Sequence, residues 1–266
     1  MTTKKYAPHT FAISALFTVG NAVLLMYQFD LLHSAISLVS SLVLIGLSAF
    51  LLRRFKTNKL VFRFLLVVVG IISAYGAVTA FLDYIRFLKV EQMSETNTML
   101  LGALLLAIII VFSVSKKTAI YKYGLFVFVV SVLIIVVCFA SGINSFDFKN
   151  ETASLLSRSF SIKDFLRFFL PVVILPFWIG DESGTKTICG GVAMAFLLLL
   201  VTALQVLLTF GQSDGVLYPY LKSVGVISSG SLFTRLDGLV WFLFFVTELI
   251  KIAVCINAIL KIIKQK

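Results

Sequence analysis

Long apolar segments alternate with short polar ones along almost the whole chain. About eight of the apolar segments have the length of roughly 17–25 residues that a helix needs to cross a bilayer. The pattern therefore predicts an all-α protein, a polytopic membrane helical bundle with about eight transmembrane helices. The predicted spans are residues 10–27, 34–52, 62–82, 98–115, 123–142, 164–180, 187–210 and 238–260, with loops between them.

The composition agrees with this pattern. Hydrophobic residues make up 60% of the 266 residues and charged residues 13%, whereas a soluble domain has about 25% charged residues. The polar segments between the apolar ones are too short to fold by themselves. Residues 1–266 are therefore predicted to form a single transmembrane domain.

The sequence contains no recognisable catalytic pattern. A nucleophile elbow, a phosphate-binding loop and a zinc-protease motif are all absent from it. The three cysteines, Cys138, Cys189 and Cys255, are widely spaced and offer neither a disulfide framework nor a metal ligand set. We therefore expect no enzymatic activity, no cofactor and no metal.

The net charge of +11 comes largely from lysines and arginines at the ends of the apolar segments. Short basic runs in these places encode membrane topology, whereas nucleic-acid binding needs a continuous basic face. We expect contact with membrane lipid and none with nucleic acid. A cytoplasmic N-terminus places the larger share of the basic residues on the inner side, and an even number of spans then predicts a multi-pass protein with both termini cytoplasmic.

Residues that weaken a helix interrupt two of the apolar segments. Gly20 and Asn21 lie in the middle of the first segment, and Pro171 and Pro176 lie in the sixth. Breaks in a membrane helix release backbone amides and carbonyls that a ligand can bind. The candidate ligand-binding residues are Gly20, Asn21, Tyr75, Phe177, Trp178 and Glu182.

Several of these candidates also have a purely structural interpretation. Gly20 can let two helices approach closely, and Pro176 can simply kink or end its helix. Tyr75 belongs to a stripe of polar and small residues that also suits helix packing. Trp178 lies near a span end, where tryptophan anchors helices at the bilayer surface. The sequence leaves both interpretations open.

Four charged residues mark the last apolar segment. Glu248 and Lys251 lie inside it, three residues apart and therefore on one face of a helix. Charges inside a membrane are costly and often functional, but the alternative is a mutually neutralised pair that holds helices together. Arg235 and Asp237 precede the span, where they can serve as cap and interface anchor or contact a gate or a partner subunit.

The last third of the chain carries its motifs in a distinctive order. An apolar segment ends in Thr209-Phe210-Gly211, Tyr218-Pro219 follows in a loop, and Phe233-Thr234-Arg235-Leu236-Asp237 leads towards Trp241 and Lys251. In this order the motifs resemble the spore germination permease family, the GerAB-type B subunit of nutrient germinant receptors, within the amino acid–polyamine–organocation superfamily. The N-terminal FTVGNAVLL also resembles the family's discontinuous first helix. Glu182 resembles the acidic residue at the end of the family's sixth helix.

The resemblance implies a fold and a function. The family has ten spans in two inverted sets of five, so this chain is expected to have an incomplete 5+5 inverted-repeat, LeuT-like permease fold. The implied function is that of a membrane subunit that senses a small nutrient, such as an amino acid, to trigger germination. Its implied partners are a soluble-headed membrane subunit and a lipoprotein, in the bacterial cell membrane or the spore inner membrane. Two other functions stay open: an ion-coupled amino acid secondary transporter, and a non-binding scaffold subunit of a membrane complex.

Overall fold

The computed structural model describes residues 7–22, 31–91, 102, 106–110, 117–143, 146–147, 170–180, 184–210, 219–229 and 236–264. Within these ranges every regular element is helical, and five helices are long and apolar enough to cross a membrane. The elements are α1 (Ala7–Ala22), α2 (Leu31–Arg54), α3 (Lys59–Glu91), α5 (Lys117–Gly142), the 3-10 helix η4 (Leu170–Val173), α7 (Ile174–Ile179), α8 (Thr185–Phe210), α9 (Pro219–Ser229) and α10 (Leu236–Lys264). The prediction of an all-α membrane protein is confirmed.

Five of the predicted spans correspond to the membrane-length helices α2, α3, α5, α8 and α10. The first predicted span corresponds to α1, which has 16 residues within the described part. Most of the span predicted at 98–115 lies outside the described residues. The described part of the sixth span consists of two short pieces, η4 and α7.

The two prolines and one glycine explain why the sixth segment is divided. Pro171 lies in η4 and Pro176 in the first turn of α7, where a missing N–H breaks no helical hydrogen bond. Gly180 then ends α7 with a φ of 73°, which side chains other than glycine rarely adopt.

Three segments predicted as loops are helical in part, so these predictions were wrong. Helix α3 continues through residues 83–91, because Tyr84, Phe87 and Leu88 recur at helical spacing and are buried. Helix α5 begins at Lys117, inside the predicted loop 116–122. Helix α9 lies inside the predicted loop 211–237 and begins at Pro219, since proline is well suited to the first helical position.

A tight turn joins α2 to α3. The amide of Phe55 donates to the carbonyl of Leu51 at 3.0 Å, which ends α2. The side chain of Asn58 then accepts the Val61 N–H at 3.3 Å and caps the start of α3. This turn places the basic end of α2 beside the start of α3.

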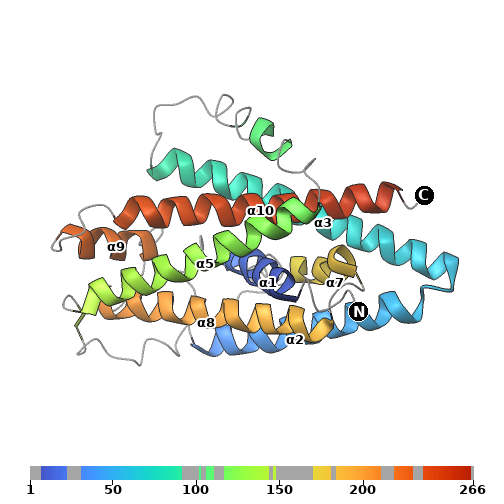
Figure 1. Ribbon diagram of the computed structural model, residues 1–266, viewed down its shortest axis with the longest axis horizontal. Coiled ribbons are helices and arrows are strands. Elements are labelled where there is room, and N and C mark those ends of the chain that lie inside the picture. Colours follow the sequence, from blue (N-terminus) through green and yellow to red (C-terminus); the bar gives the residue numbers. More distant parts are fainter. Residues whose placement is uncertain are drawn as a thin grey trace.

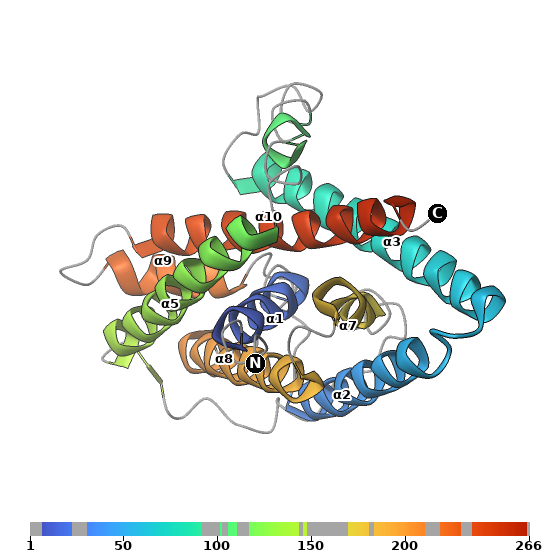
Figure 2. The same cartoon turned by 45° about the vertical axis from the view of Figure 1, so that its right-hand side comes forward.

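Helices α1 and α7 are the two short elements at the centre of the bundle. Figures 1 and 2 both place them between a layer that contains α3 and α10 and a layer that contains α2 and α8. From Ala12 to Val19 every residue of α1 is buried, including Ser14 and Thr18. The core of the bundle therefore surrounds a helix that carries several hydroxyl groups.

Candidate functional site along helix α10

Helix α10 is the most buried of the five membrane-length helices. In α10, 67% of the residues in the most apolar stretch are buried. The corresponding share is 56% in α8 and 28% in each of α2, α3 and α5. Its contacts with α3 run antiparallel, since the ring of Tyr84 lies 5.4 Å from that of Phe245 while Gly70 faces Ile262. The face of α10 that carries the predicted charges therefore points into protein.

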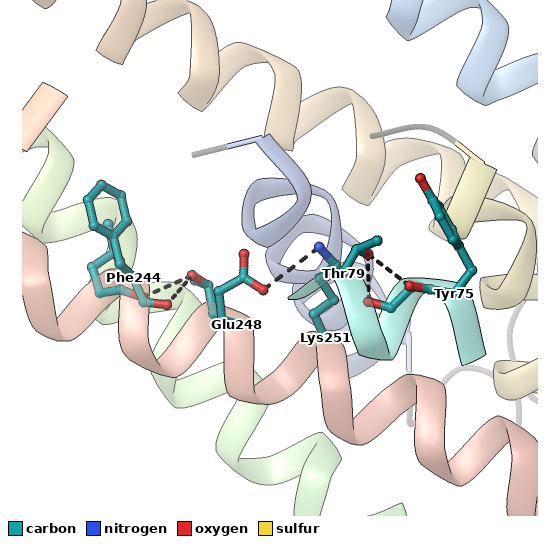
Figure 3. Close-up of polar contacts among 8 residues, drawn as sticks. Tyr75, Thr79, Phe244, Glu248 and Lys251 are labelled. Atoms are coloured by element: carbon teal, nitrogen blue, oxygen red, sulfur yellow. Dashed lines mark hydrogen bonds and ion pairs between the residues drawn. The ribbon is translucent and has the colours of Figure 1, made fainter. Parts of the chain in front are cut away.

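Glu248 and Lys251 form an ion pair inside the bundle. The Lys251 Nζ and Glu248 Oε2 atoms are 3.7 Å apart, and each side chain is only 4% exposed. Figure 3 shows the two side chains directed toward one another from successive turns of α10. Two desolvated charges persist in such a place only if they compensate one another. The predicted pairing of these residues is confirmed.

Gly20 brings α1 against α10 just before this pair. A Cβ atom at Gly20 would lie 3.0 Å from the carbonyl oxygen of Thr247 and 3.7 Å from the amide nitrogen of Glu248. The Thr247 hydroxyl donates to the carbonyls of Leu243 and Phe244, at 3.0 and 3.1 Å. Gly20 therefore allows the close helix approach that its structural interpretation predicts, and the same contact places α1 beside the charged pair.

One turn after Lys251, α10 meets α3 and η4. A Cβ atom at Gly76 would lie 3.2 Å from the Cys255 Sγ atom and 3.5 Å from the Cβ atom of Pro171. Tyr75, the neighbouring residue, is 41% exposed, and its ring is directed away from the Glu248 carboxylate in Figure 3. Its backbone carbonyl accepts the Thr79 hydroxyl at 2.9 Å. Gly76, and not Tyr75, is the residue of this pair that faces the centre of the bundle.

The last turns of α10 meet α7. The ammonium group of Lys261 donates to the Phe177 carbonyl at 2.7 Å and lies 4.7 Å from the centre of the Phe177 ring. Trp178 is 2% exposed, and its ring lies 5.5 Å from that of Tyr121. Trp178 is thus a core residue, so its interpretation as an anchor at the bilayer surface was wrong.

These contacts divide the predicted ligand-binding residues between two places. From Thr247, which touches Gly20, to Lys261, which touches Phe177, α10 advances by roughly 21 Å at about 1.5 Å per residue. Gly20 and Phe177 therefore do not line one small pocket. Glu182 and Arg235 lie outside the described residues, as do the side chains of Asn21 and Asp237.

Sequence reasoning missed three residues that shape this region. Nothing in the sequence distinguishes Thr247 and Cys255 from other residues of an apolar helix. In the structure a glycine of another helix approaches each of them, Gly20 at Thr247 and Gly76 at Cys255. Lys261 follows the last predicted span, where a basic residue indicates membrane topology. Its contact with Phe177 joins residues 84 positions apart, for which no local pattern exists.

The site holds a charged pair and polar backbone groups. Within the ranges that the structure describes, no three His, Cys, Asp or Glu residues gather closely enough to hold a metal ion. The chain matches no protein-family model, no curated protein and no solved structure.

Proposed function

We propose that this chain is a multi-pass membrane subunit of a spore nutrient-germinant receptor that binds a small nutrient such as an amino acid. The observation that carries the proposal is the buried Glu248–Lys251 pair, whose Oε2 and Nζ atoms are 3.7 Å apart. The pair lies next to the point where α1 contacts α10. A zwitterionic amino acid offers one carboxylate and one ammonium group. A compensated charge pair next to a short central helix is a suitable host for both.

The short central helices support a permease-like fold. Both α1 and η4–α7 are shorter than a span within the described part, and both lie inside the bundle. In the proposed arrangement of eight spans these are the discontinuous helices one and six of an inverted-repeat permease, with both termini cytoplasmic. The Arg235-Leu236-Asp237 element, at which α10 begins, is the sequence feature that points to the germination family.

Nutrient binding becomes a signal if it favours one packing of the helices over another. The contact between Gly20 and Thr247 is a suitable place for such a change, because a shift of α1 alters the surroundings of Glu248 directly. A soluble-headed membrane subunit and a lipoprotein are the proposed partners that receive the signal.

Thermal unfolding of the purified chain in the presence of each amino acid tests this proposal. We expect one or a few amino acids to raise the unfolding temperature in proportion to the logarithm of their concentration. If no nutrient stabilises a well-folded sample, the sensing role is wrong and the scaffold function takes its place.

The same buried pair also favours a second function, an ion-coupled amino acid transporter, since intramembrane charges often relay protons or replace ions. Uptake of the stabilising amino acid into proteoliposomes distinguishes the two functions. A transporter accumulates the amino acid when a proton or sodium gradient is imposed, whereas a receptor subunit only binds it.

A further inference from the structure

The side chain of Gln205 is a polar group in the core of the bundle that the charged pair does not explain. It is 0% exposed and belongs to the membrane-length helix α8. Within the described part of the chain, neither its Oε1 atom nor its Nε2 atom has a hydrogen-bond partner. Folded proteins nearly always pair buried amides with protein, water or a ligand, because an unpaired one is destabilising. A polar side chain in this state inside a membrane helix indicates a binding role.

Gln205 lies on the face of α8 that packs against α1. A Cβ atom at Gly191 would lie 2.8 Å from the Cβ atom of Ser14 in α1. Thr202 and Gln205 follow Gly191 by about three and four turns, so they return to the same face of α8, and both are buried. Leu200, on the opposite face, is 38% exposed. The amide therefore points toward the centre of the bundle.

The charged pair of α10 lies on the other side of α1. Thr247 is the residue of α10 that a Cβ atom at Gly20 would meet. Lys251 comes four residues after Thr247 and shares its face of the helix. Figures 1 and 2 both show α1 between α8 and α10. Gln205 and the Glu248–Lys251 pair therefore face α1 from opposite sides.

Helices α8 and α10 run in opposite directions. Thr185 at the start of α8 and Lys261 near the end of α10 line the same pocket. At the other end, α9 packs against both helices. The ring of Tyr220 in α9 lies 6.4 Å from that of Phe244, which belongs to the first half of α10.

This arrangement fixes the height of Gln205 relative to the pair. At about 1.5 Å per residue, Gln205 lies roughly 30 Å from the start of α8, and Glu248 lies roughly 20 Å from Lys261. Gln205 is therefore roughly 10 Å further along the bundle than Glu248. That offset is too long for the two charged groups of an amino acid but suits its side chain.

We propose that Gln205 binds the side chain of the nutrient whose charged groups the Glu248–Lys251 pair holds, and that this side chain both donates and accepts hydrogen bonds, as a carboxamide does. The inference rests on the proposed nutrient site and names its ligand class. The Gln205 amide offers two donors and one acceptor. A carboxamide on the ligand complements both kinds of group.

The unpaired amide also supplies the difference in affinity that a signal requires. In the described packing its two polar atoms are closed off from solvent. A ligand reaches them only when the helices around α1 move apart, and the amide is more stable once it is paired. Ligand binding therefore favours the second packing of the helices.

The test compares the binding of L-glutamine and L-methionine, whose unbranched side chains have similar lengths. Binding to the purified full chain is measured by equilibrium dialysis. We expect the wild type to bind glutamine at least about tenfold more tightly, because methionine leaves the polar groups of the site unpaired. Gln205→Met should lose this preference. It should also raise the unfolding temperature of the ligand-free protein by about 2 °C or more, since it removes an unpaired buried amide at nearly constant volume.

Asn257→Leu is the matched control. Asn257 carries a partly buried amide on α10, and this amide donates to the Ala253 carbonyl at 3.0 Å. Its replacement should leave the preference for glutamine unchanged. Circular dichroism and size-exclusion chromatography report the folding of each variant.

The outcomes separate this inference from the nutrient site on which it rests. No preference for glutamine in a wild type that binds any amino acid, or an unchanged preference in Q205M, would overturn the role of Gln205 and leave the nutrient site standing. Loss of the preference in both variants would also overturn it. So would a lower unfolding temperature or a failure to fold in Q205M, because the amide would then have structural partners. A folded wild type that binds no amino acid would refute the nutrient site itself.

Discussion

Removal of one member of the Glu248–Lys251 pair should destabilise the bundle far more than removal of both. Lys251→Met leaves the Glu248 carboxylate only 4% exposed and without its lysine partner. Glu248→Gln leaves the Lys251 ammonium group equally buried and without its carboxylate partner. Breaking a buried ion pair from one side costs about 3–5 kcal/mol of unfolding free energy. The double variant E248Q/K251M has no charge to desolvate, so it should unfold within about 1.5 kcal/mol of the wild type.

The geometry sets the scale of this effect. Opposite charges about 4 Å apart attract one another by about 4 kcal/mol at an effective dielectric constant of 20, and the Nζ and Oε2 atoms are 3.7 Å apart. Lys264 provides the matched control, because it is an exposed lysine of the same helix. Lys264→Met should change stability by less than about 0.5 kcal/mol.

Unfolding in mixed micelles with increasing SDS, followed by circular dichroism, gives the free energy for all four variants. Reaction of Cys255 with a fluorogenic thiol reagent gives a second reading, because this residue is fully buried one turn after Lys251. The reasoning is refuted if the costs of the two single substitutions add within about 0.5 kcal/mol in the double variant, as they do for uncoupled sites.

Other substitutions test the packing and the caps. Gly20→Ala should lower the free energy of unfolding by about 1–3 kcal/mol through overpacking against Thr247. Gly46→Ala is the control, because a Cβ atom there meets nothing within 4 Å, and it should raise that free energy by about 0.5–1 kcal/mol through helix propensity. Equal effects of the two substitutions in SDS titration would show that α1 does not touch α10. Asn58→Ala should cost about 0.5–2 kcal/mol by removing the cap of α3, and an unchanged unfolding midpoint would argue against the cap. In the folded protein Cys189, which is half-buried, should react with a small thiol reagent before the buried Cys255 does. Mass spectrometry of the labelled peptides measures the order of reaction, and earlier labelling of Cys255 would contradict the packing around it.

The sequence was sufficient for the features that depend on local pattern. Runs of apolar residues predicted five helices that the structure has, and the spacing of Glu248 and Lys251 predicted that they share a face. Pro171 and Pro176 marked an interruption of the sixth segment, whose described part is a 3-10 helix followed by a short α-helix. Each of these follows from helix geometry or backbone chemistry within a few residues.

The features that the sequence missed depend on contacts between distant segments. The end of α3 has the charged composition of a loop, and only burial of Phe87 against Trp241 and Phe244 explains why it is helical. Trp178 lies near the end of an apolar segment, as an interface anchor does, but α7 is inside the bundle. The contact of Lys261 with Phe177 likewise depends on how α7 sits against α10.

The proposed nutrient site has one most direct test, which is the binding of a labelled amino acid to the wild type and to E248Q/K251M, measured by equilibrium dialysis. The double variant removes the charges while keeping the fold, so a loss of binding reports on the site itself. We predict saturable binding of at least one amino acid by the wild type. The double variant should bind it at least about tenfold more weakly, because the loss of even one charge-assisted contact has an effect of that size. Equal binding by both proteins, or no saturable binding by a folded wild type, would contradict the assignment of the Glu248–Lys251 pair to a nutrient site.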